Sequence, residues 1–514
     1  MSRDRGRRRL VALAAATWLG LAGVCAWRTA GGASDDAYIT YRYAHNLARG
    51  DGLVFNPGER VFGATEPGWV LALAAARRLT GAPLHWLGPL LYGASLAALA
   101  TLLLASVCRS TPSRWPEALA GGTLLVTSST LWVSQGFGWP LALALLAAAG
   151  HWAPQRPALA GSLAGFAVWC RPEAGLGVAL LALLELRRNR RVPWLLAGAA
   201  AAGVLLGVAL ATAYYGSPLP HTWVAKQAAA PAGLSALERW RLYHAVDWRF
   251  LHGHLGGLAP ALFAGGLAGA VPLLRHGGAA ARLVVLLAAV LALVQPLLGA
   301  SYSLWYQIPA VAAVSFALPF ALGTVARWLA AHAPAATRPA AFAAAAALAI
   351  LLLLPWLAHH ARFLFAPRQE TYLDSYRRAA QWLARTTGPN ADLATTEIGI
   401  LGYWSDRQVE DLRGLVTPRI VPYVAFGDVR WAFLDRPTRF VVVHQRRPRM
   451  VTLRRQEWFQ EAYLPVQRFA DPSGELVIYR RRRWARLPPP PELPAEILAA
   501  HGRPAELAAR VRRD

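Results

Sequence analysis

Two adjacent carboxylates, Asp35 and Asp36, follow the first apolar segment and stand among aromatic residues, with Arg42 close by in sequence. Ionisable groups placed where a bilayer gives way to water commonly have functional roles and perturbed pKa values. The structural alternative is equally open, because acidic residues are also favoured at helix N-termini. The pair is therefore a candidate chemical centre or a helix cap.

A second candidate is Arg171-Pro172-Glu173, which separates two apolar segments shorter than the roughly 20 residues that a bilayer requires. A shallow hairpin there would admit water near the Arg171 and Glu173 side chains. Alternatively, Arg171 and Glu173 form an ion pair that closes a helix hairpin.

Further along, prolines and a glycine keep residues 214–226 irregular, and His221 and Lys226 offer cationic groups beside Trp223. This segment is either a phosphate-binding loop or an ordinary ordered surface loop. Trp305 and Tyr306, at the end of an apolar segment, are typical of an interfacial aromatic belt.

The composition is that of a membrane protein. Of 514 residues, 55% are hydrophobic and 16% are charged, against roughly 25% charged in soluble proteins. Apolar runs recur from Leu10 to Ala358 and then stop. We predict a membrane domain over residues 1–358 with outer loops 31–80 and 215–256, an α/β domain over 359–486, and a Pro-rich tail with a possible helix over 487–514.

The net charge of +25 is distributed as the positive-inside rule predicts, in the N-terminus, in short gaps between apolar runs and at residues 480–483 in the C-terminal domain. This pattern favours lipid headgroups over nucleic acid as the partner. The three cysteines, Cys25, Cys108 and Cys170, predict neither a disulfide framework nor a metal or redox motif.

Residues 10–27 are long enough to span, so we expect a retained first helix in preference to a cleaved signal peptide. Basic gaps favour a surface position for the apolar segment 67–79. With segment 67–79 on the surface, we predict about eleven membrane spans in total, and the first helix is one of them. The other ten are residues 84–107, 117–133, 137–152, 157–170, 172–186, 192–214, 257–274, 283–299, 308–325 and 340–357. The candidate site residues and the C-terminal domain then share the outer face.

In the C-terminal domain, helices are predicted near 372–385 and 454–462. Strands are predicted near 391–396, 399–403, 408–412, 440–444, 466–469 and 476–480. The doublet Glu410-Asp411 is interpreted as structural.

Several blocks in order resemble the GT-C fold glycosyltransferases that use polyprenyl-phosphate sugars. The matching segments are DDAYITYRYA at 35–44, GLVFNPGERV at 52–61, RPE at 171–173, YGSPLP at 215–220 with Thr222 and Lys226, and EIGILGY at 397–403, which leads to Asp411-Leu412 and Gly414-Leu415. The chain is most similar in appearance to the mycobacterial terminal β-(1→2) arabinofuranosyltransferase type, some relatives of which are named flagellar motor control protein. Departures occur at residues 62–65, at Gly138, where an acidic residue is usual, and at His221, where Asn is common.

The resemblance implies a multi-pass GT-C-like helical protein in a bacterial plasma membrane. It implies inverting transfer of a sugar, such as arabinofuranose, from a polyprenyl monophosphate to a hydroxyl of a cell-envelope glycan, lipid or protein on the outer face. Asp35 would accept the hydroxyl proton. Asp36 would orient the acceptor, bind a divalent cation or offset charge at the anomeric carbon.

The same resemblance implies that Arg171 and Lys226, with His221 secondary, stabilise the leaving phosphate. Arg42, Glu173, Trp305 and Tyr306 complete the predicted substrate-binding set. Two rival functions are a catalytically inactive scaffold, which Gly138 favours, and a secondary transporter, for which the sequence offers no inverted repeat.

Overall fold

The computed structural model describes residues 2–229, 234–298, 303–490 and 492–513. Its contacts divide the chain into two compact units. Unit 1 consists of Met1–Ala33, His85–Gly207 and Leu234–Ala366, and unit 2 of Ser34–Leu84, Val208–Gly233 and Pro367–Asp514. Unit 2 therefore contains most of predicted loop 31–80, part of loop 215–256 and the C-terminal domain. The predicted boundaries at 358 and 486 stay predictions.

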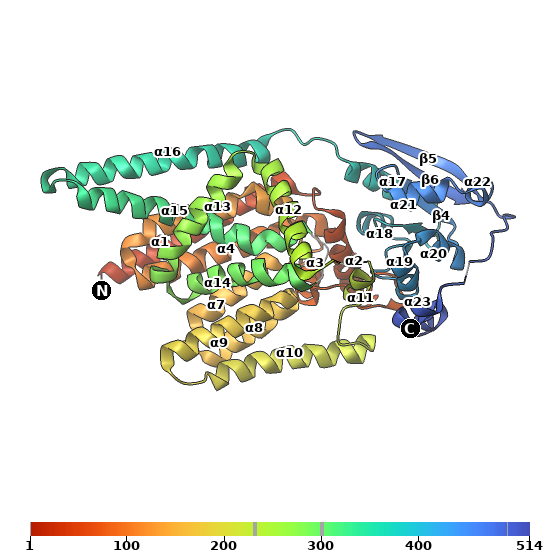
Figure 1. Cartoon of the computed structure of the whole chain (residues 1–514), viewed down its shortest axis with the longest axis horizontal. Coiled ribbons are helices and arrows are strands. Elements are labelled where there is room, and N and C mark those ends of the chain that lie inside the picture. The colour runs from red at the N-terminus through yellow and green to blue at the C-terminus, as the bar shows by residue number, and fades with distance from the viewer. Residues whose placement is uncertain (1, 230–233, 299–302, 491, 514) are drawn as a thin grey trace. The chain divides into compact units, whose positions relative to one another are not determined.

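Unit 1 is helical throughout its described residues (Figure 1). Its helices are α1 (Ser2–Thr29), α4 (Leu84–Ser110), α5 (Trp115–Thr127), α6 (Ser129–Val133), α7 (Trp139–Trp152), α8 (Pro157–Cys170), α9 (Gly175–Asn189), α10 (Trp194–Tyr215, which continues into unit 2), α12 (Ala236–Leu255), α13 (Leu258–His276), α14 (Gly278–Val294), α15 (Ile308–His332) and α16 (Arg338–Phe365).

Among the described residues, seven helices are long and apolar enough to cross a membrane by length and composition: Arg5–Thr29, Leu84–Ser110, Trp194–Tyr215, Leu258–His276, Gly278–Leu297, Trp305–His332 and Ala335–Phe365. The other four predicted spans are helical but shorter. Helices α7 and α8 have 14 residues each, α9 has 15, and the segment 117–133 is interrupted at Ser128 between α5 and α6. The fold is nonetheless the predicted multi-pass helical one.

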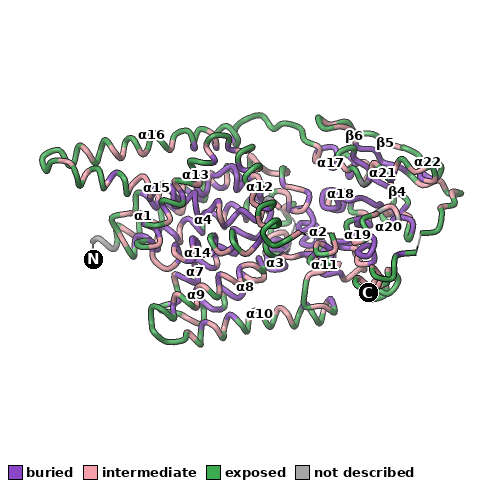
Figure 2. Tube along the Cα trace, viewed as in Figure 1, coloured by how far each residue is buried: buried purple, intermediate pink, exposed green. Residues whose placement is uncertain are grey.

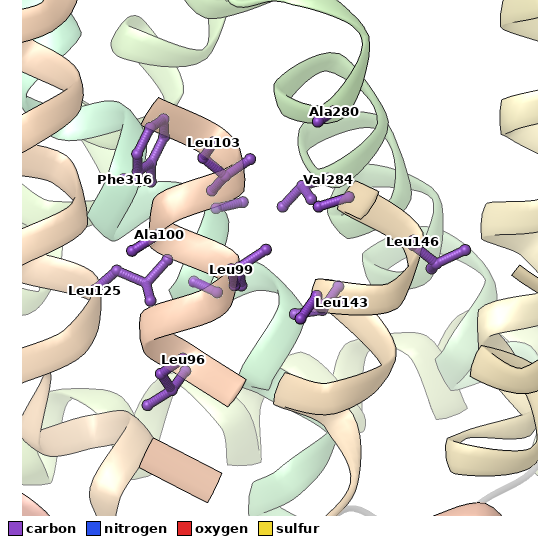
Figure 3. Packing of buried hydrophobic residues seen from close by; sticks show 14 of the residues in the cluster. Leu96, Leu99, Ala100, Leu103, Leu125, Leu143, Leu146, Ala280, Val284 and Phe316 are labelled. Carbon is purple, nitrogen blue, oxygen red and sulfur yellow. The ribbon is translucent and has the colours of Figure 1, made fainter. Parts of the chain in front are cut away.

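The core of unit 1 is built from aliphatic side chains on the faces that α4, α5, α7, α14 and α15 turn toward one another. Leu96, Leu99 and Leu103 of α4 lie among side chains such as Val284 of α14 and Phe316 of α15 (Figure 3). Glycine permits the closest helix approaches, because a Cβ at Gly269 of α13 would overlap the carbonyl oxygen of Ala317 in α15. This packing fixes the helix ends that carry Arg171 and Tyr306.

The outer helices expose apolar side chains, as spans that face lipid must. Much of α10 and α16 is drawn as exposed or intermediate (Figure 2). Leu205 and Leu210 of α10, and Ile350 and Leu351 of α16, are each more than half exposed. Unit 1 thus combines an apolar core with outer helices that expose apolar side chains.

Unit 2 contains helices around a five-stranded mixed sheet. The strand order is β3 (Gln408–Asp411), β2 (Asp392–Thr395), β4 (Phe440–His444), β6 (Gly474–Arg481), β5 (Tyr463–Asp471), with β2 parallel to β3 and β4 and the remaining pairs antiparallel. A separate two-stranded pair joins β1 (Glu59–Arg60) to β7 (Arg512–Arg513).

The helices of unit 2 are α2 (Asp35–Arg49), α3 (Pro67–Thr80), α11 (His221–Ala228), α17 (Tyr372–Thr386), α18 (Gly399–Ser405), α19 (Val421–Phe426), α20 (Val429–Asp435), α21 (Pro448–Arg454), α22 (Glu457–Ala462), α23 (Ala495–His501) and α24 (Pro504–Ala509). The predicted helices near 372–385 and 454–462 are confirmed, and the tail forms two short helices, α23 and α24, where one possible helix was predicted. Five of the six predicted strands are confirmed.

The prediction of a strand over 399–403 is wrong, because these residues form helix α18. The β-branched and aromatic residues there favour a strand locally. The decisive contact, however, is with a residue far away in the sequence, because the first backbone N–H groups of α18 donate hydrogen bonds to the Asp35 side chain. Tertiary capping therefore overrides local propensity.

Candidate functional site

Asp35 caps helix α18 and lies in the first turn of its own helix, α2. Its Oδ2 accepts a hydrogen bond from the backbone N–H of Gly399 at 2.9 Å, and its Oδ1 accepts one from that of Ile400 at 2.8 Å. The residue is 6% exposed. The alternative, in which Asp35 and Asp36 cap the helix that begins with Ala37, is replaced by a tertiary cap, because the Asp35 side chain binds a helix that begins 364 residues away in the chain.

Glu397, two residues before α18, joins this carboxylate site. Its Oε1 lies 2.6 Å from Nη2 of Arg447 and 3.9 Å from Nη1 of Arg413. Burial, followed by repulsion from Asp35, raises the pKa of Glu397 to about 8, although Arg447 acts in the opposite direction. Arg447 favours the ionised form of Glu397. Because this one guanidinium also acts on Asp35, we conclude that the pKa of Glu397 is raised overall.

Burial also raises the pKa of Asp35, to about 6, and the neighbouring Asp36 adds to this effect. The two backbone hydrogen bonds and Arg447 oppose the rise. Because burial raises the pKa of both carboxyl groups, and repulsion from Asp35 adds to the rise at Glu397, the two hold a proton more tightly than isolated carboxyl groups do. Such groups are characteristic of functional sites.

Aromatic rings lie next to Arg447, the guanidinium that pairs with Glu397. The Arg447 guanidinium carbon lies 5.7 Å from the centroid of the Tyr372 ring, and that of Arg446 lies 4.6 Å from it. Arg447 also hydrogen-bonds Tyr376, a buried residue of α17. These contacts hold Arg447 beside Glu397.

Asp36 differs from its neighbour in exposure. Its side chain is half-buried, whereas Asp35 is buried and hydrogen-bonded through both oxygens. Among the described residues, no three His, Cys, Asp or Glu side chains are grouped so as to hold a metal ion. The residues present do not fit a complete cation site, so the divalent cation near Asp35 and Asp36 stays a prediction.

Arg42 lies inside unit 2 at 1% exposure and holds backbone segments together. Its Nε donates to the carbonyl of Phe55 at 2.6 Å, its Nη2 to that of Arg407 at 2.7 Å, and its Nη1 to that of Gly402. Burial lowers the pKa of Arg42 to about 10, which still leaves the guanidinium charged at neutral pH. We therefore interpret Arg42 as a structural residue, in place of the predicted contact with substrate.

The two residues predicted on the loop 214–226 belong to helix α11 in unit 2. Burial lowers the pKa of His221 to about 4, so its imidazole is neutral near pH 7 and is no cationic phosphate ligand there. Lys226 is half-buried in the last turn of α11 and is the only lysine in the sequence. Of the two predicted cations on this segment, Lys226 stays the candidate.

Arg171 and Glu173 in unit 1 form the ion pair that the alternative interpretation predicts. Arg171 Nη2 lies 2.8 Å from Glu173 Oε1, and Arg171 is only 3% exposed. The guanidinium also lies over two rings, 5.3 Å from the Trp139 centroid and 5.5 Å from the Tyr306 centroid. Trp305 is half-buried and stacks on Phe137 at 4.3 Å.

The predicted residues thus form two groups. Asp35, Asp36, Arg42, His221 and Lys226 belong to unit 2. Arg171, Glu173, Trp305 and Tyr306 belong to unit 1. That Arg171 and Asp35 serve one reaction centre stays a prediction.

Glu397 and Arg447 were missed as site residues. Glu397 begins the EIGILGY segment, which the sequence singles out, and an acidic residue ahead of two glycines is the available signal. Arg447 is one of many arginines in the C-terminal α/β domain, and its sequence context does not distinguish it. Only the fold brings it to Glu397.

The fold is similar to those of solved membrane proteins. ArnT from Cupriavidus metallidurans bound to undecaprenyl phosphate has 12% identity and a TM-score of 0.57, over 93% of this chain and 99% of that one. An Archaeoglobus fulgidus oligosaccharyltransferase tethered to an acceptor peptide has 12% identity and a TM-score of 0.52, over 92% of this chain and 74% of that one. AglB from the same organism, in complex with an inhibitory peptide and a dolichol-phosphate, has 12% identity and a TM-score of 0.51, with the same coverages of 92% and 74%.

Residues 366–487 match the model of a domain of unknown function, DUF8728. The match lies within the α/β portion of unit 2 and includes Glu397 and Arg447. No curated protein matches the sequence. The solved structures establish a GT-C membrane fold for the chain.

Proposed function

We propose that the chain is a membrane glycosyltransferase that transfers a sugar from a polyprenyl monophosphate to a hydroxyl acceptor. The observation that carries the proposal is the carboxylate site in which buried Asp35 and Glu397, with half-buried Asp36, lie near Arg447, in a chain with the GT-C fold. Similar structures bind undecaprenyl phosphate or dolichol-phosphate. An isoprenoid donor suits a helical unit with an apolar exterior.

The reaction requires a base because an alcohol is a weak nucleophile at neutral pH. The acceptor oxygen forms a bond to the anomeric carbon as the bond from that carbon to the phosphate oxygen breaks. The hydroxyl proton passes to a carboxylate, and the bonding electrons leave with the phosphate. Attack opposite the leaving group inverts the anomeric centre.

The hydrogen bonds of Asp35 favour Asp36 as the base, although the sequence predicted Asp35 for that role. Asp36 is half-buried, so an acceptor hydroxyl reaches it more readily than it reaches Asp35. Both Asp35 oxygens already accept backbone hydrogen bonds. We assign Asp36 as the base and Asp35 as the residue that positions helices α2 and α18.

Lys226 and Arg171 are proposed to offset the charge that develops on the leaving phosphate. Lys226 offers an ammonium group on α11, and Arg171 offers a guanidinium group packed against Trp139 and Tyr306. Arg171 already pairs with Glu173, so phosphate would share that guanidinium or displace the carboxylate. No step is assigned to a metal ion.

The finer parts of the proposal rest on the resemblance in sequence. They are arabinofuranose as the sugar, a cell-envelope acceptor, and a bacterial plasma membrane with the site on its outer face. A panel of radiolabelled polyprenyl-phosphate sugars, supplied to membranes that contain the full chain, tests them. Product is expected from one donor, whereas no product from any donor with folded protein would contradict the proposal.

An inactive scaffold derived from such an enzyme is the second candidate, and Gly138 is the observation that favours it. Gly138 precedes helix α7 where the resembling family usually has an acidic residue. Under this alternative, Asp36→Asn leaves the cellular phenotype intact while the protein stays folded. Under the enzyme proposal, the same variant loses product.

A further inference from the structure

Helices α5, α15 and α16 of unit 1 border an apolar groove of about 460 Å³. Its lining includes Trp115, Leu119, Leu322, Phe342, Ile350 and Leu353. The volume lies within the range of about 300–1,000 Å³ that is typical of small-ligand sites. All three helices belong to unit 1, and none of these residues enters the proposed reaction.

An ion pair whose carboxylate is buried and whose guanidinium is partly exposed lines the same groove. Arg327 of α15 pairs with Glu117 of α5, and Glu117 is only 7% exposed. Gly323 makes room for this contact, because a Cβ there would overlap the Glu117 carboxylate. In the described part of the chain, Glu117 Oε2 and Arg327 Nε are buried without a hydrogen-bond partner.

A second arginine, Arg114, lies beside this ion pair, so positive charges outnumber negative ones there. Arg114 stands between the lining residues Ser113 and Trp115, and its Nη1 donates to the Thr324 hydroxyl at 3.1 Å. Thr324 directly follows Gly323 on α15. Two guanidinium groups therefore accompany one carboxylate, which leaves a net positive charge for an anion.

We propose that this groove binds an acyl chain of an anionic glycerophospholipid, whose headgroup phosphate contacts Arg114 and Arg327. Hydrocarbon is the matching occupant, because α15 and α16 are among the helices long and apolar enough to cross a membrane and the groove wall is mostly apolar. The excess arginine selects an anionic headgroup over a zwitterionic one. On the predicted topology these arginines face the cytoplasm, the side on which basic residues meet anionic lipid.

A photoreactive residue in place of Ala349 tests the site in the full chain. Ala349 lines the groove, whereas Ala347 on the same helix is exposed and is absent from the lining, so Ala347 is the matched control position. The protein is placed in nanodiscs of phosphatidylglycerol and phosphatidylcholine, irradiated, and the lipid adducts are weighed by mass spectrometry. The ratio of phosphatidylglycerol to phosphatidylcholine adducts is expected to be about five times higher at position 349 than at position 347.

The variant Arg114→Gln tests the charge while it leaves the Glu117–Arg327 ion pair intact. Enrichment of phosphatidylglycerol at position 349 is expected to fall toward the value at position 347. Ala346→Trp, which fills the groove from α16, is expected to reduce all adducts at position 349. The same lipid ratio at both positions, no lipid adduct at 349, or preferential adducts of added undecaprenyl phosphate would each overturn the proposal.

Discussion

Asp35 accepts a hydrogen bond from the backbone N–H of Gly399 through Oδ2 at 2.9 Å, and this bond, with a second one from Ile400, joins two helices that are far apart in the sequence. Asp35 begins α2, and Gly399 begins α18. A Cβ at Gly399 would overlap the carbonyl oxygen of Asp35. Glycine at this position therefore lets α18 approach α2 closely enough to be capped.

The variant Gly399→Ala tests this approach. We expect it to destabilise unit 2 by about 1–3 kcal/mol, because the added methyl group has no space at the α2–α18 contact. Gly388→Ala is the matched control, since a Cβ there meets nothing within 4 Å. Thermal unfolding of both purified variants measures the difference, and equal melting temperatures would contradict this packing.

Arg42→Met separates a structural role for Arg42 from a substrate-binding one. We expect a loss of about 1–3 kcal/mol in the free energy of unfolding, because the guanidinium donates two buried hydrogen bonds and one partly buried hydrogen bond to backbone carbonyls. The control Arg49→Met removes only exposed ion pairs with Asp51 and Asp406 and is expected to cost at most about 1 kcal/mol. A stable Arg42→Met protein with an impaired KM for donor would restore the substrate-binding interpretation.

The helices and strands were largely predictable because their signals are local. Strand β4 coincides with the predicted 440–444, and helix α17 matches the predicted helix to within a residue. The strand predicted at 399–403 failed because Asp35 caps those residues as a helix. Glu397 and Arg447 were missed as site residues for the same reason, since their chemistry arises from contacts that tertiary folding creates.

Glu397→Gln is expected to weaken the pH dependence of stability. The folded-state pKa of Glu397 is raised from 4.5 to about 8 by burial, so between these values the folded state holds a proton that the unfolded state has lost. The free energy of unfolding therefore falls as pH rises through that window. Melting temperatures taken from about pH 5 to about pH 8 should fall less for the variant than for the natural protein.

The control for this measurement is Glu370→Gln, an exposed residue that pairs with Arg378 on the surface. It is expected to leave the pH dependence unchanged. If Glu397→Gln and the natural protein lose stability in parallel over the window, the raised pKa of Glu397 is contradicted.

His221→Asn is expected to retain transfer activity within about threefold. The pKa of His221 lies near 4 because the side chain is buried, so the natural residue is already neutral at neutral pH. Asparagine is also neutral and polar. A loss of about tenfold or more, the size expected when a charged hydrogen bond is removed, would show that His221 acts as a cation.

Lys226→Met is expected to lower the rate of transfer about tenfold or more, because it removes a charged hydrogen bond to the leaving phosphate. Lys226→Arg is the charge-conserving control and should recover part of the loss. Since Lys226 is the only lysine in the sequence, acylation of ε-amino groups should have the same effect as the methionine variant. Full activity in Lys226→Met would remove Lys226 from the phosphate site.

The most direct test of the assigned base compares Asp36→Asn with Asp51→Asn during transfer of a radiolabelled sugar from its polyprenyl-phosphate donor. Asp51 is also acidic and partly exposed, but it pairs with Arg49 at the surface. We expect Asp36→Asn to lower the transfer rate by about 10²–10⁴-fold, with melting temperature and donor binding retained. Asp51→Asn should leave the rate unchanged. Transfer at the natural rate by a folded Asp36→Asn protein would contradict the account.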